Sequence, residues 1–135
     1  MSIHIQPVLA PGSQETFSHL ITDDEVSTFA RLVGMQMPVE SDAEEEGDDS
    51  TSISKLLMVG IIGGLLKTRF SKLGSQCINL HFEFLSPIHC GDSIETTITM
   101  ASPDQGKHLA TFNVDCYNQT KDQVITGQAV MIMPH

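Results

Sequence analysis

The chain has 135 residues, which is close to the commonest size of a single domain, and two halves would each be too small to bury a good core. Hydrophobic residues make up 40% and charged residues 18%, which excludes a disordered chain. The formal net charge of -10 opposes binding to nucleic acid and to anionic membranes. We therefore expect one domain spanning residues 1–135 that binds neither.

The amino terminus and the cysteines indicate a cytoplasmic protein. Residues 1–12 contain no basic cluster followed by an apolar run, so no secretory signal is predicted. The three cysteines, Cys77, Cys90 and Cys116, include no Cys-x-x-Cys pair, which argues against a disulfide framework and against a zinc site. We expect neither a metal ion nor a cofactor.

The first elements of the chain are a strand and a short helix. Residues 17–21 are expected to form the strand. Thr22 followed by Glu25 is a capping-box pattern, and apolar residues then recur at helical spacing from Val26 onward. This pattern predicts an amphipathic helix over residues 23–33.

An acidic segment and a long apolar segment follow. Residues 40–54 are dense in Asp, Glu, Ser and Thr, which predicts an exposed loop. Residues 56–66 lack any polar side chain and are far shorter than the ~20 residues needed to cross a bilayer, so we predict a buried helix that ends near Lys67. Three glycines in this helix suggest a backbone pressed closely against a sheet: Gly60, Gly63 and Gly64.

The rest of the chain has the alternation of strands. Ile78, Leu80, Phe82 and Phe84 alternate with polar residues, which predicts a half-buried strand that ends before Pro87. Further strands are expected over residues 93–100, 109–117 and 124–133, with Pro103 to Gly106 forming one of the turns. We expect these four consecutive strands to form an antiparallel meander.

The order of these elements predicts an α+β hot-dog fold. The apolar face of the sheet must be buried, and the apolar helix is the only predicted element hydrophobic enough to cover it. We therefore expect the antiparallel sheet to wrap around a long central helix. Hot-dog proteins usually form dimers by joining their sheets edge to edge, which removes an exposed edge strand.

Three segments carry a resemblance to one known family. The sequence Phe84-Leu85-Ser86-Pro87-Ile88-His89-Cys90-Gly91-Asp92 is similar to that family's strand ending in Phe-x-x-Pro-x-x-x-Gly-Asp, and residues 25–30 and 126–130 match in the same order. The chain thus resembles the MaoC-like, (R)-specific enoyl-CoA hydratases from about residue 21 onward.

The resemblance places two replaced residues at the catalytic segment. In the family, Asp-x-Asn-Pro-x-His activates a water that adds across an enoyl thioester. Anchored on Pro38, Met35 stands at the position of the aspartate and Glu40 at that of the histidine. Met35 cannot transfer a proton, so the acid/base pair is degenerate. Glu40 is either a lone general base or a solvated loop residue, and Met35 and Met37 either line an apolar pocket or fill gaps in the core.

A second signature, a His-Gly step at the start of the central helix, corresponds to Ser54-Lys55. In the family, backbone donors there polarise the thioester carbonyl, so we expect Ser54 and Lys55 at the mouth of an elongated pocket that runs beside the helix from Leu56. Lys67 and Arg69, with Lys72, either hold the phosphates of coenzyme A or meet a carrier protein, or they are a solvated helix end.

Two functions remain open. The first is an enzyme-like protein that binds an acyl thioester, on coenzyme A or acyl carrier protein, lacks standard hydratase activity and has been repurposed for another reaction. The second is a non-catalytic binding module or the silent partner of an active hydratase subunit. The assembly is accordingly a homodimer or a heterodimer with a homologue.

Overall fold

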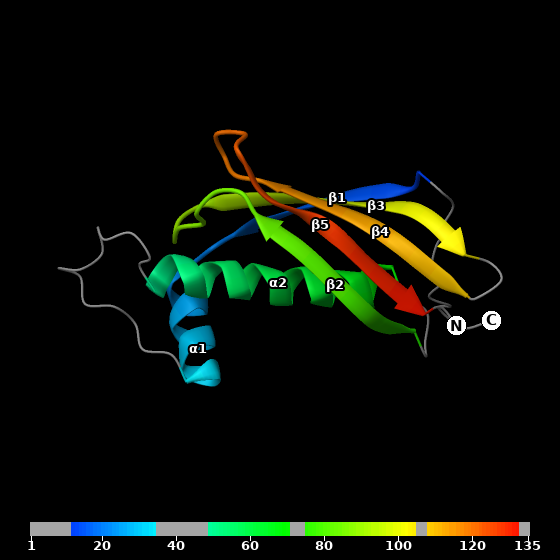
Figure 1. The fold of residues 1–135 in the computed structure, drawn as a ribbon. Helices are drawn as coiled ribbons and strands as arrows, with labels where there is room; N and C mark the ends of the chain where they lie inside the picture. Colours follow the sequence, from blue (N-terminus) through cyan, green and yellow to red (C-terminus); the bar gives the residue numbers. More distant parts are fainter. Residues whose placement is uncertain (1–11, 35–48, 71–74, 105–107, 133–135) are drawn as a thin grey trace, which may run out of the picture.

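A five-stranded antiparallel sheet arches over one long helix in the computed structural model, which describes residues 12–34, 49–70, 75–104 and 108–132 (Figure 1). A second, shorter helix stands beneath one end of the long helix (Figure 1). In chain order the elements are β1 (Gln14–Leu20), α1 (Asp23–Val33), α2 (Asp49–Arg69), β2 (Gln76–Phe84), β3 (Ser93–Asp104), β4 (Leu109–Tyr117) and β5 (Gln123–Ile132).

The strand order in the sheet is β1-β3-β4-β5-β2, so the predicted four-strand meander is wrong in one respect. Strands β3, β4 and β5 follow one another as predicted, but β2 pairs with β5 at the far edge and not with β3. Residues 85–92 form a long connection from β2, at one edge of the sheet, to β3, which lies next to β1 near the opposite edge. The first strand also begins at Gln14, earlier than predicted, and Pro103 and Asp104 belong to β3 and not to a turn.

Helix α1 has the predicted bounds and the predicted cap. The Thr22 hydroxyl accepts a hydrogen bond from the Glu25 amide, and the Glu25 carboxylate accepts one from the Thr22 amide. These two bonds satisfy amide groups that have no partner within the helix. Gly34 ends the helix with a φ of 78°, a left-handed conformation that suits glycine.

Helix α2 begins at Asp49, so the prediction of an exposed loop over residues 40–54 is wrong for its last part. Residues 40–48 lie outside the described part of the chain. The side chains of Ile53 and Ser54 are fully buried, which gives the first turns of α2 a face packed into the core. Burial of this face outweighs the low helix propensity of the Asp, Ser and Thr residues that suggested a loop.

The buried face of α2 follows helical spacing through Met58, Ile62 and Leu66, all fully buried in the core cluster. The glycines lie elsewhere, because a Cβ added at Gly60, Gly63 or Gly64 would have nothing within 4 Å. The expectation that these glycines press the helix against the sheet is therefore wrong for the described chain. Together with exposed Leu56 they form an outward face of small and apolar residues.

The segment Thr51–Arg69 of α2 is long and apolar enough to cross a membrane, judged by length and composition alone. A helix in the core of a soluble protein passes the same test. Here α2 lies against the concave side of the sheet (Figure 1), and its row of large buried side chains packs into the protein core.

Gly91 and Asp92, which match the family's Gly-Asp step, are joined to Ile21 by backbone hydrogen bonds, and this connection is here called the clasp. Gly91, with a φ of 93°, donates from its amide to the Ile21 carbonyl, and the Ile21 amide donates to the Asp92 carbonyl. The buried Asp92 carboxylate accepts hydrogen bonds from the His89 amide and the Gln119 side chain. The clasp fixes the point where β1 ends and α1 begins, and so positions α1 relative to the sheet.

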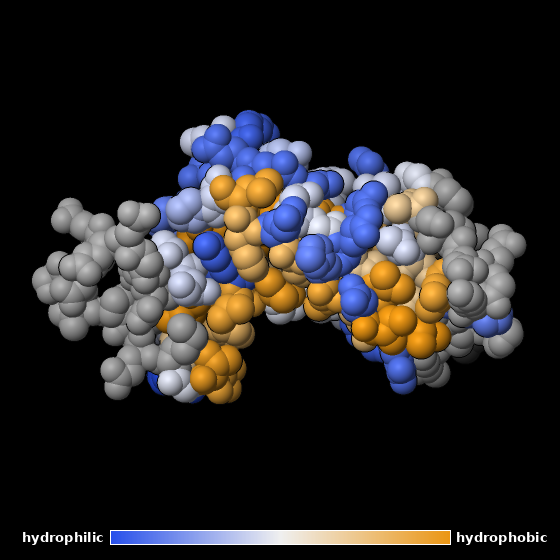
Figure 2. Space-filling view, in the orientation of Figure 1, coloured by the Kyte–Doolittle hydropathy of each residue, from blue (hydrophilic) through white to orange (hydrophobic). Residues whose placement is uncertain are grey.

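Strand β2 has the predicted residues but not the predicted burial. Ile78, Leu80 and Phe84 are 50%, 42% and 37% exposed, so the strand is not half-buried in the single chain. The reason is its position at the edge of the sheet, next to β5 alone. Hydrophobic residues accordingly remain at the surface on the side that carries β2 and α2 (Figure 2).

Candidate functional site

Three of the predicted site residues, Met35, Met37 and Glu40, lie outside the described residues. The proposed replacement of the family's acid/base pair therefore stays a prediction from the sequence. Helix α1 ends at Val33 and α2 begins at Asp49, so the segment that contains these residues joins the two helices. The remaining candidates all lie on α2 and can be placed.

Ser54, Lys55 and Leu56 lie near the amino-terminal end of α2 but face different surroundings. Ser54 is fully buried, whereas the Lys55 side chain reaches to the ring of Phe84 on β2, with Nζ 5.4 Å from the ring centroid. Leu56 is 47% exposed. Lys55 thus links α2 to the edge strand β2 through a cation–π contact, in which the face of the Phe84 ring attracts the ammonium group.

Lys67 and Arg69 lie at the opposite end of α2 and are both engaged with the protein. Lys67 donates a hydrogen bond to the Ser75 carbonyl at 2.6 Å, while Arg69 pairs with Glu15 at 3.3 Å and covers the ring of Phe17. At 1.5 Å per residue, Lys67 is about 18 Å from Lys55 along the helix axis. The structure therefore does not bring the two groups of predicted ligand-binding residues together.

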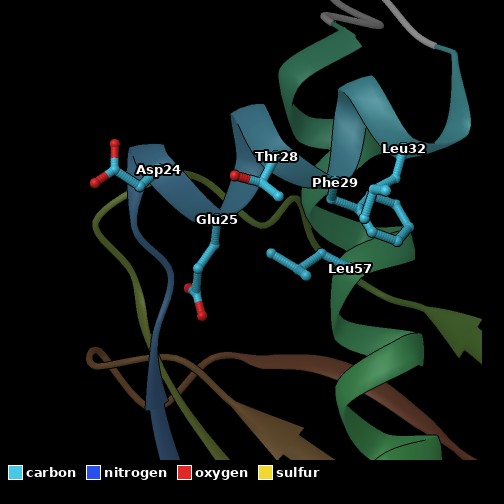
Figure 3. A pocket seen from close by; sticks show the side chains of 6 residues that line it. All are labelled: Asp24, Glu25, Thr28, Phe29, Leu32 and Leu57. Atoms are coloured by element: carbon cyan, nitrogen blue, oxygen red, sulfur yellow. The ribbon is translucent and has the colours of Figure 1, made fainter.

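A pocket of about 350 Å³ opens between α1 and α2 (Figure 3). Phe29, Leu32 and Leu57 supply its apolar walls, and Thr28 lies above Leu57. Asp24 and Glu25 lie at the amino-terminal end of α1, with carboxylates that point away from each other (Figure 3). The pocket lies beside α2 on the side of α1, and none of the predicted site residues that the structure describes lines it.

An ion pair lies next to this pocket. His19 Nε2 is 2.8 Å from Glu25 Oε2, which links β1 to α1. Burial raises the pKa of the Glu25 carboxyl, but the hydrogen bonds from the Thr22 amide and His19, with the His19 charge, hold the pKa below its ordinary value. A histidine oriented by a carboxylate is a common acid/base unit. Here Glu25 also caps α1, so we interpret the pair as a link between elements.

Cys116 is not a nucleophile in this arrangement. Burial raises the pKa of its thiol to about 11, and the hydrogen bond with Thr96 opposes this shift only in part. At neutral pH the side chain is a protonated thiol within the core. In the described part of the chain, no three His, Cys, Asp or Glu side chains lie close enough to hold a metal ion.

Sequence reasoning missed the pocket between the helices. Phe29 lies in the amphipathic helix predicted over residues 23–33 and Leu57 in the buried helix predicted over residues 56–66, but periodicity does not reveal which surfaces of two helices meet. A signal was present at Leu32, an apolar residue that falls outside the helical repeat of Val26, Phe29 and Ala30 and is 78% exposed in the structure. An apolar residue just outside the buried stripe of an amphipathic helix indicates a surface available for contact.

Similarity to known proteins extends over nearly the whole chain. The chain is 25% identical to an (R)-specific enoyl-CoA hydratase of Rhodospirillum rubrum over 138 aligned residues, which cover 98% of this chain and 93% of the relative. No protein-family model matches the chain.

Solved structures agree on the fold. The (R)-hydratase of Aeromonas caviae superimposes with a TM-score of 0.80 at 21% identity, covering 93% of this chain and 98% of the other. A MaoC-like dehydratase from Rhodospirillum rubrum gives 0.72 at 19% identity and 94% coverage of both chains. The HadBC (3R-hydroxyacyl-ACP dehydratase) complex of Mycobacterium tuberculosis gives 0.67 at 15% identity, covering 94% and 99%.

The structural likenesses confirm the predicted hot-dog fold, and the full-length sequence relationship agrees with the motifs found in the sequence. The chain has the hot-dog fold of the MaoC-like dehydratases, and over nearly its whole length its sequence is similar to an (R)-specific enoyl-CoA hydratase.

Proposed function

We propose that this protein binds an acyl thioester, carried by coenzyme A or acyl carrier protein, without the hydration activity of its relatives. The observation that carries the proposal is the sequence Met35-Gln36-Met37-Pro38-Val39-Glu40 in a chain otherwise related to hydratases over nearly its full length. Hydration needs one group to take a proton from water and another to deliver a proton to the substrate carbon. A thioether does neither, which leaves Glu40 as the single candidate base.

The surroundings of α2 support an apolar ligand. Phe29, Leu32 and Leu57 form an open apolar pocket at one end of the helix, and Leu56 is exposed on its outward face. Apolar walls with few polar groups are typical of sites for acyl chains. Lys55 is held against Phe84, so its ammonium stays near the edge strand, where an anionic or carbonyl-bearing head group would meet it.

The proposal is tested with crotonyl-CoA and four forms of the chain. The wild-type protein should bind crotonyl-CoA in calorimetry but should show no hydration, since losing a positioned acid or base costs about 100- to 10,000-fold in rate. The variant Met35→Asp/Met37→Asn/Glu40→His restores the family's residue types and should gain measurable hydration. Adding Lys55→Gly to it should raise the rate again if the lysine side chain obstructs the thioester.

The control is Glu40→Gln. Rapid wild-type turnover that Glu40→Gln abolishes would show that the site is an active one with a single carboxylate, and would overturn the proposal. Absence of crotonyl-CoA binding, together with absence of binding to longer enoyl-CoA esters, would overturn the ligand class.

A second candidate function is that of a partner subunit, favoured by the exposed apolar edge of β2. Ile78, Leu80 and Phe84 lie on the free edge of the sheet, and such an edge invites pairing with another chain. We propose that the protein assembles through this edge in the cytoplasm, either with itself or with a catalytically intact homologue. Mass measurement by light scattering on the purified chain separates a self-assembled dimer from a monomer that awaits a different partner.

A further inference from the structure

The turn between β4 and β5 is held in shape by the side chain of Asn118. Its Oδ1 accepts hydrogen bonds from the Thr120 amide at 3.0 Å, the Thr120 hydroxyl at 2.8 Å and the Asp122 amide at 3.0 Å. The Asn118 amide donates in turn to the Asp122 carbonyl at 2.9 Å. A turn whose backbone groups are paired in this way fixes the direction of the side chain that it carries at Gln119.

Gln119 connects this turn to the start of β3. Its Nε2 donates to the Asp92 carboxylate at 3.1 Å, and its Oε1 accepts from the Ser93 amide at 3.0 Å. Both ends of the side-chain amide are therefore used, one as donor and one as acceptor. The turn and residues 85–92 lie at the end of the sheet that carries α1 (Figure 1). Gln119 thus ties together two connections that are far apart in the chain.

Asp92 extends this tie to α1. The residue is 8% exposed, and its second carboxylate oxygen accepts from the His89 amide at 2.9 Å. A buried carboxylate that loses a donor is strongly destabilised, so this group stays where its donors lie. The Asp92 backbone carbonyl accepts from the Ile21 amide at 2.9 Å, and Ile21 directly precedes Thr22, the cap of α1.

Helix α1 supplies most of the pocket described above, because all of its lining residues except Leu57 belong to α1 (Figure 3). The width of the pocket therefore depends on where α1 lies relative to α2. Val26 and Ala30 are buried in the core, which fixes the face that α1 turns inward. Apolar contacts have little directional preference, so the hydrogen bonds of the clasp are what fix the position of the first turn.

We infer that Gln119 is a positioning residue for the pocket between α1 and α2, and that it acts through the Asp92 carboxylate and the clasp. Without the Gln119 side chain, Asp92 keeps one of its two donors, and the segment that holds Ile21 loses its tie to the turn between β4 and β5. The effect on a ligand rests on the proposed function, in which this pocket receives an apolar group, whereas the effect on α1 does not.

Hydrogen exchange followed by mass spectrometry tests the effect on α1. Gln119→Ala should speed exchange in peptides that cover residues 21–33 and 85–92 by about three- to tenfold, because a hydrogen bond to a buried carboxylate is lost. Peptides from the middle of β4 and β5 should keep their wild-type rates. The expected change is therefore local.

The matched control is Gln123→Ala. Gln123 also donates from Nε2 to a carboxylate, that of Asp115 at 2.8 Å, but this bond joins β5 to β4. The same side-chain type and the same kind of bond are lost at the other end of the same turn. Exchange in α1 should stay at the wild-type rate in this variant.

An exchange of donor and acceptor separates positioning from a general loss of stability. Gln119→Glu places two carboxylates together, and Asp92→Asn removes the acceptor that Gln119 Nε2 uses. In the double variant, the new amide at position 92 can donate to the new carboxylate at position 119, which still accepts from the Ser93 amide. Each single variant should speed exchange in α1, and the double variant should return it to within about twofold of wild type.

Calorimetry with crotonyl-CoA measures the effect on the ligand. Gln119→Ala should raise the dissociation constant by about three- to tenfold, because α1 no longer holds the pocket at one width. Gln123→Ala should leave the dissociation constant unchanged, and the double variant of Asp92 and Gln119 should restore the wild-type value.

The outcomes distinguish this inference from the proposed function. Exchange in α1 that Gln119→Ala leaves unchanged, or that rises equally throughout the chain, would overturn the positioning role, as would a double variant no better than the single ones. A wild-type chain that binds no enoyl-CoA ester, with the exchange results as expected, would overturn the proposed ligand and still support the positioning of α1. Crotonyl-CoA binding that Gln119→Ala leaves unchanged, while exchange in α1 rises, would overturn the link between Gln119 and the ligand.

Discussion

The Glu25 side chain has three roles: it accepts a hydrogen bond from the Thr22 amide, pairs with His19, and lines the pocket between the helices. It was predicted only as part of a capping box. The ion pair with His19 requires β1 to end next to the first turn of α1, and the clasp between Ile21 and Gly91 holds it there. The cap depends only on residues 22–25, whereas the ion pair depends on the turn between β1 and α1 that brings His19 next to Glu25.

The depressed pKa of Glu25 predicts a dependence of stability on pH. Above the ordinary value of 4.5 the carboxylate is charged in both states, and its interactions stabilise the fold in full. As the pH falls through 4.5 toward the lower folded pKa, the unfolded chain takes up the proton first, and this stabilisation is lost. Urea unfolding of wild type and Glu25→Gln should therefore differ most near neutral pH and converge in acid. A difference that stays constant over this range would contradict the assignment.

Among the elements, β2 is the one whose regular geometry depends most on the strand beside it, β5. Gly127 on β5 lies opposite Phe82, and a side chain at Gly127 would collide with the His81 carbonyl oxygen and with Phe82. The glycine thus leaves room for Phe82 to lie over the sheet, which keeps the middle of β2 regular. An isolated Gly in a strand pattern is a recognised sign of such close approach, although the sequence does not say what approaches.

Gly127→Ala should destabilise the protein by roughly 1–3 kcal/mol, since overpacking against backbone forces the strand to shift. Gly64→Ala is the control, because Gly64 has open space around it and alanine is the better helix former. Chemical denaturation of both variants measures the difference. Equal stabilities would show that β2 adjusts to the added methyl group without cost.

At the scale of the whole molecule, the single chain leaves apolar surface uncovered on the side of β2 and α2 (Figure 2). Leu56, Ile78, Leu80 and Phe84 are all exposed there, and the glycines of α2 allow another backbone to approach closely. The formal net charge of -10 keeps copies apart at long range. The proposed association therefore has to rest on short-range contacts, namely apolar burial and strand pairing.

The proposed dimer predicts that the Tm depends on protein concentration, because unfolding is then coupled to dissociation. A hundredfold increase in protein concentration should raise the wild-type Tm by several degrees, because the dimer is favoured by mass action. Leu80→Asp should lower the Tm and remove the dependence, whereas Leu32→Asp, on the exposed end of α1, should retain it. Scanning calorimetry at two concentrations makes the comparison, and a wild-type Tm independent of concentration would argue against a dimer.

The amino-acid sequence by itself determined the local features of this protein. The capping box located the start of α1, alternation located β2 and β4, and the run of apolar residues located the core of α2, because each of these signals depends on neighbours a few residues apart. The resemblance to the (R)-specific enoyl-CoA hydratases was also visible there, whereas the replacement of their acid/base pair by Met35 and Glu40 stays a prediction from the sequence.

Only the tertiary structure decided how these elements meet. It placed β2 beside β5 and at an edge, extended α2 back to Asp49, turned the glycines of α2 outward and opened the pocket between α1 and α2. Each of these outcomes depends on contacts between residues far apart in the chain, and hydrophobic periodicity tells which face is buried but not what buries it.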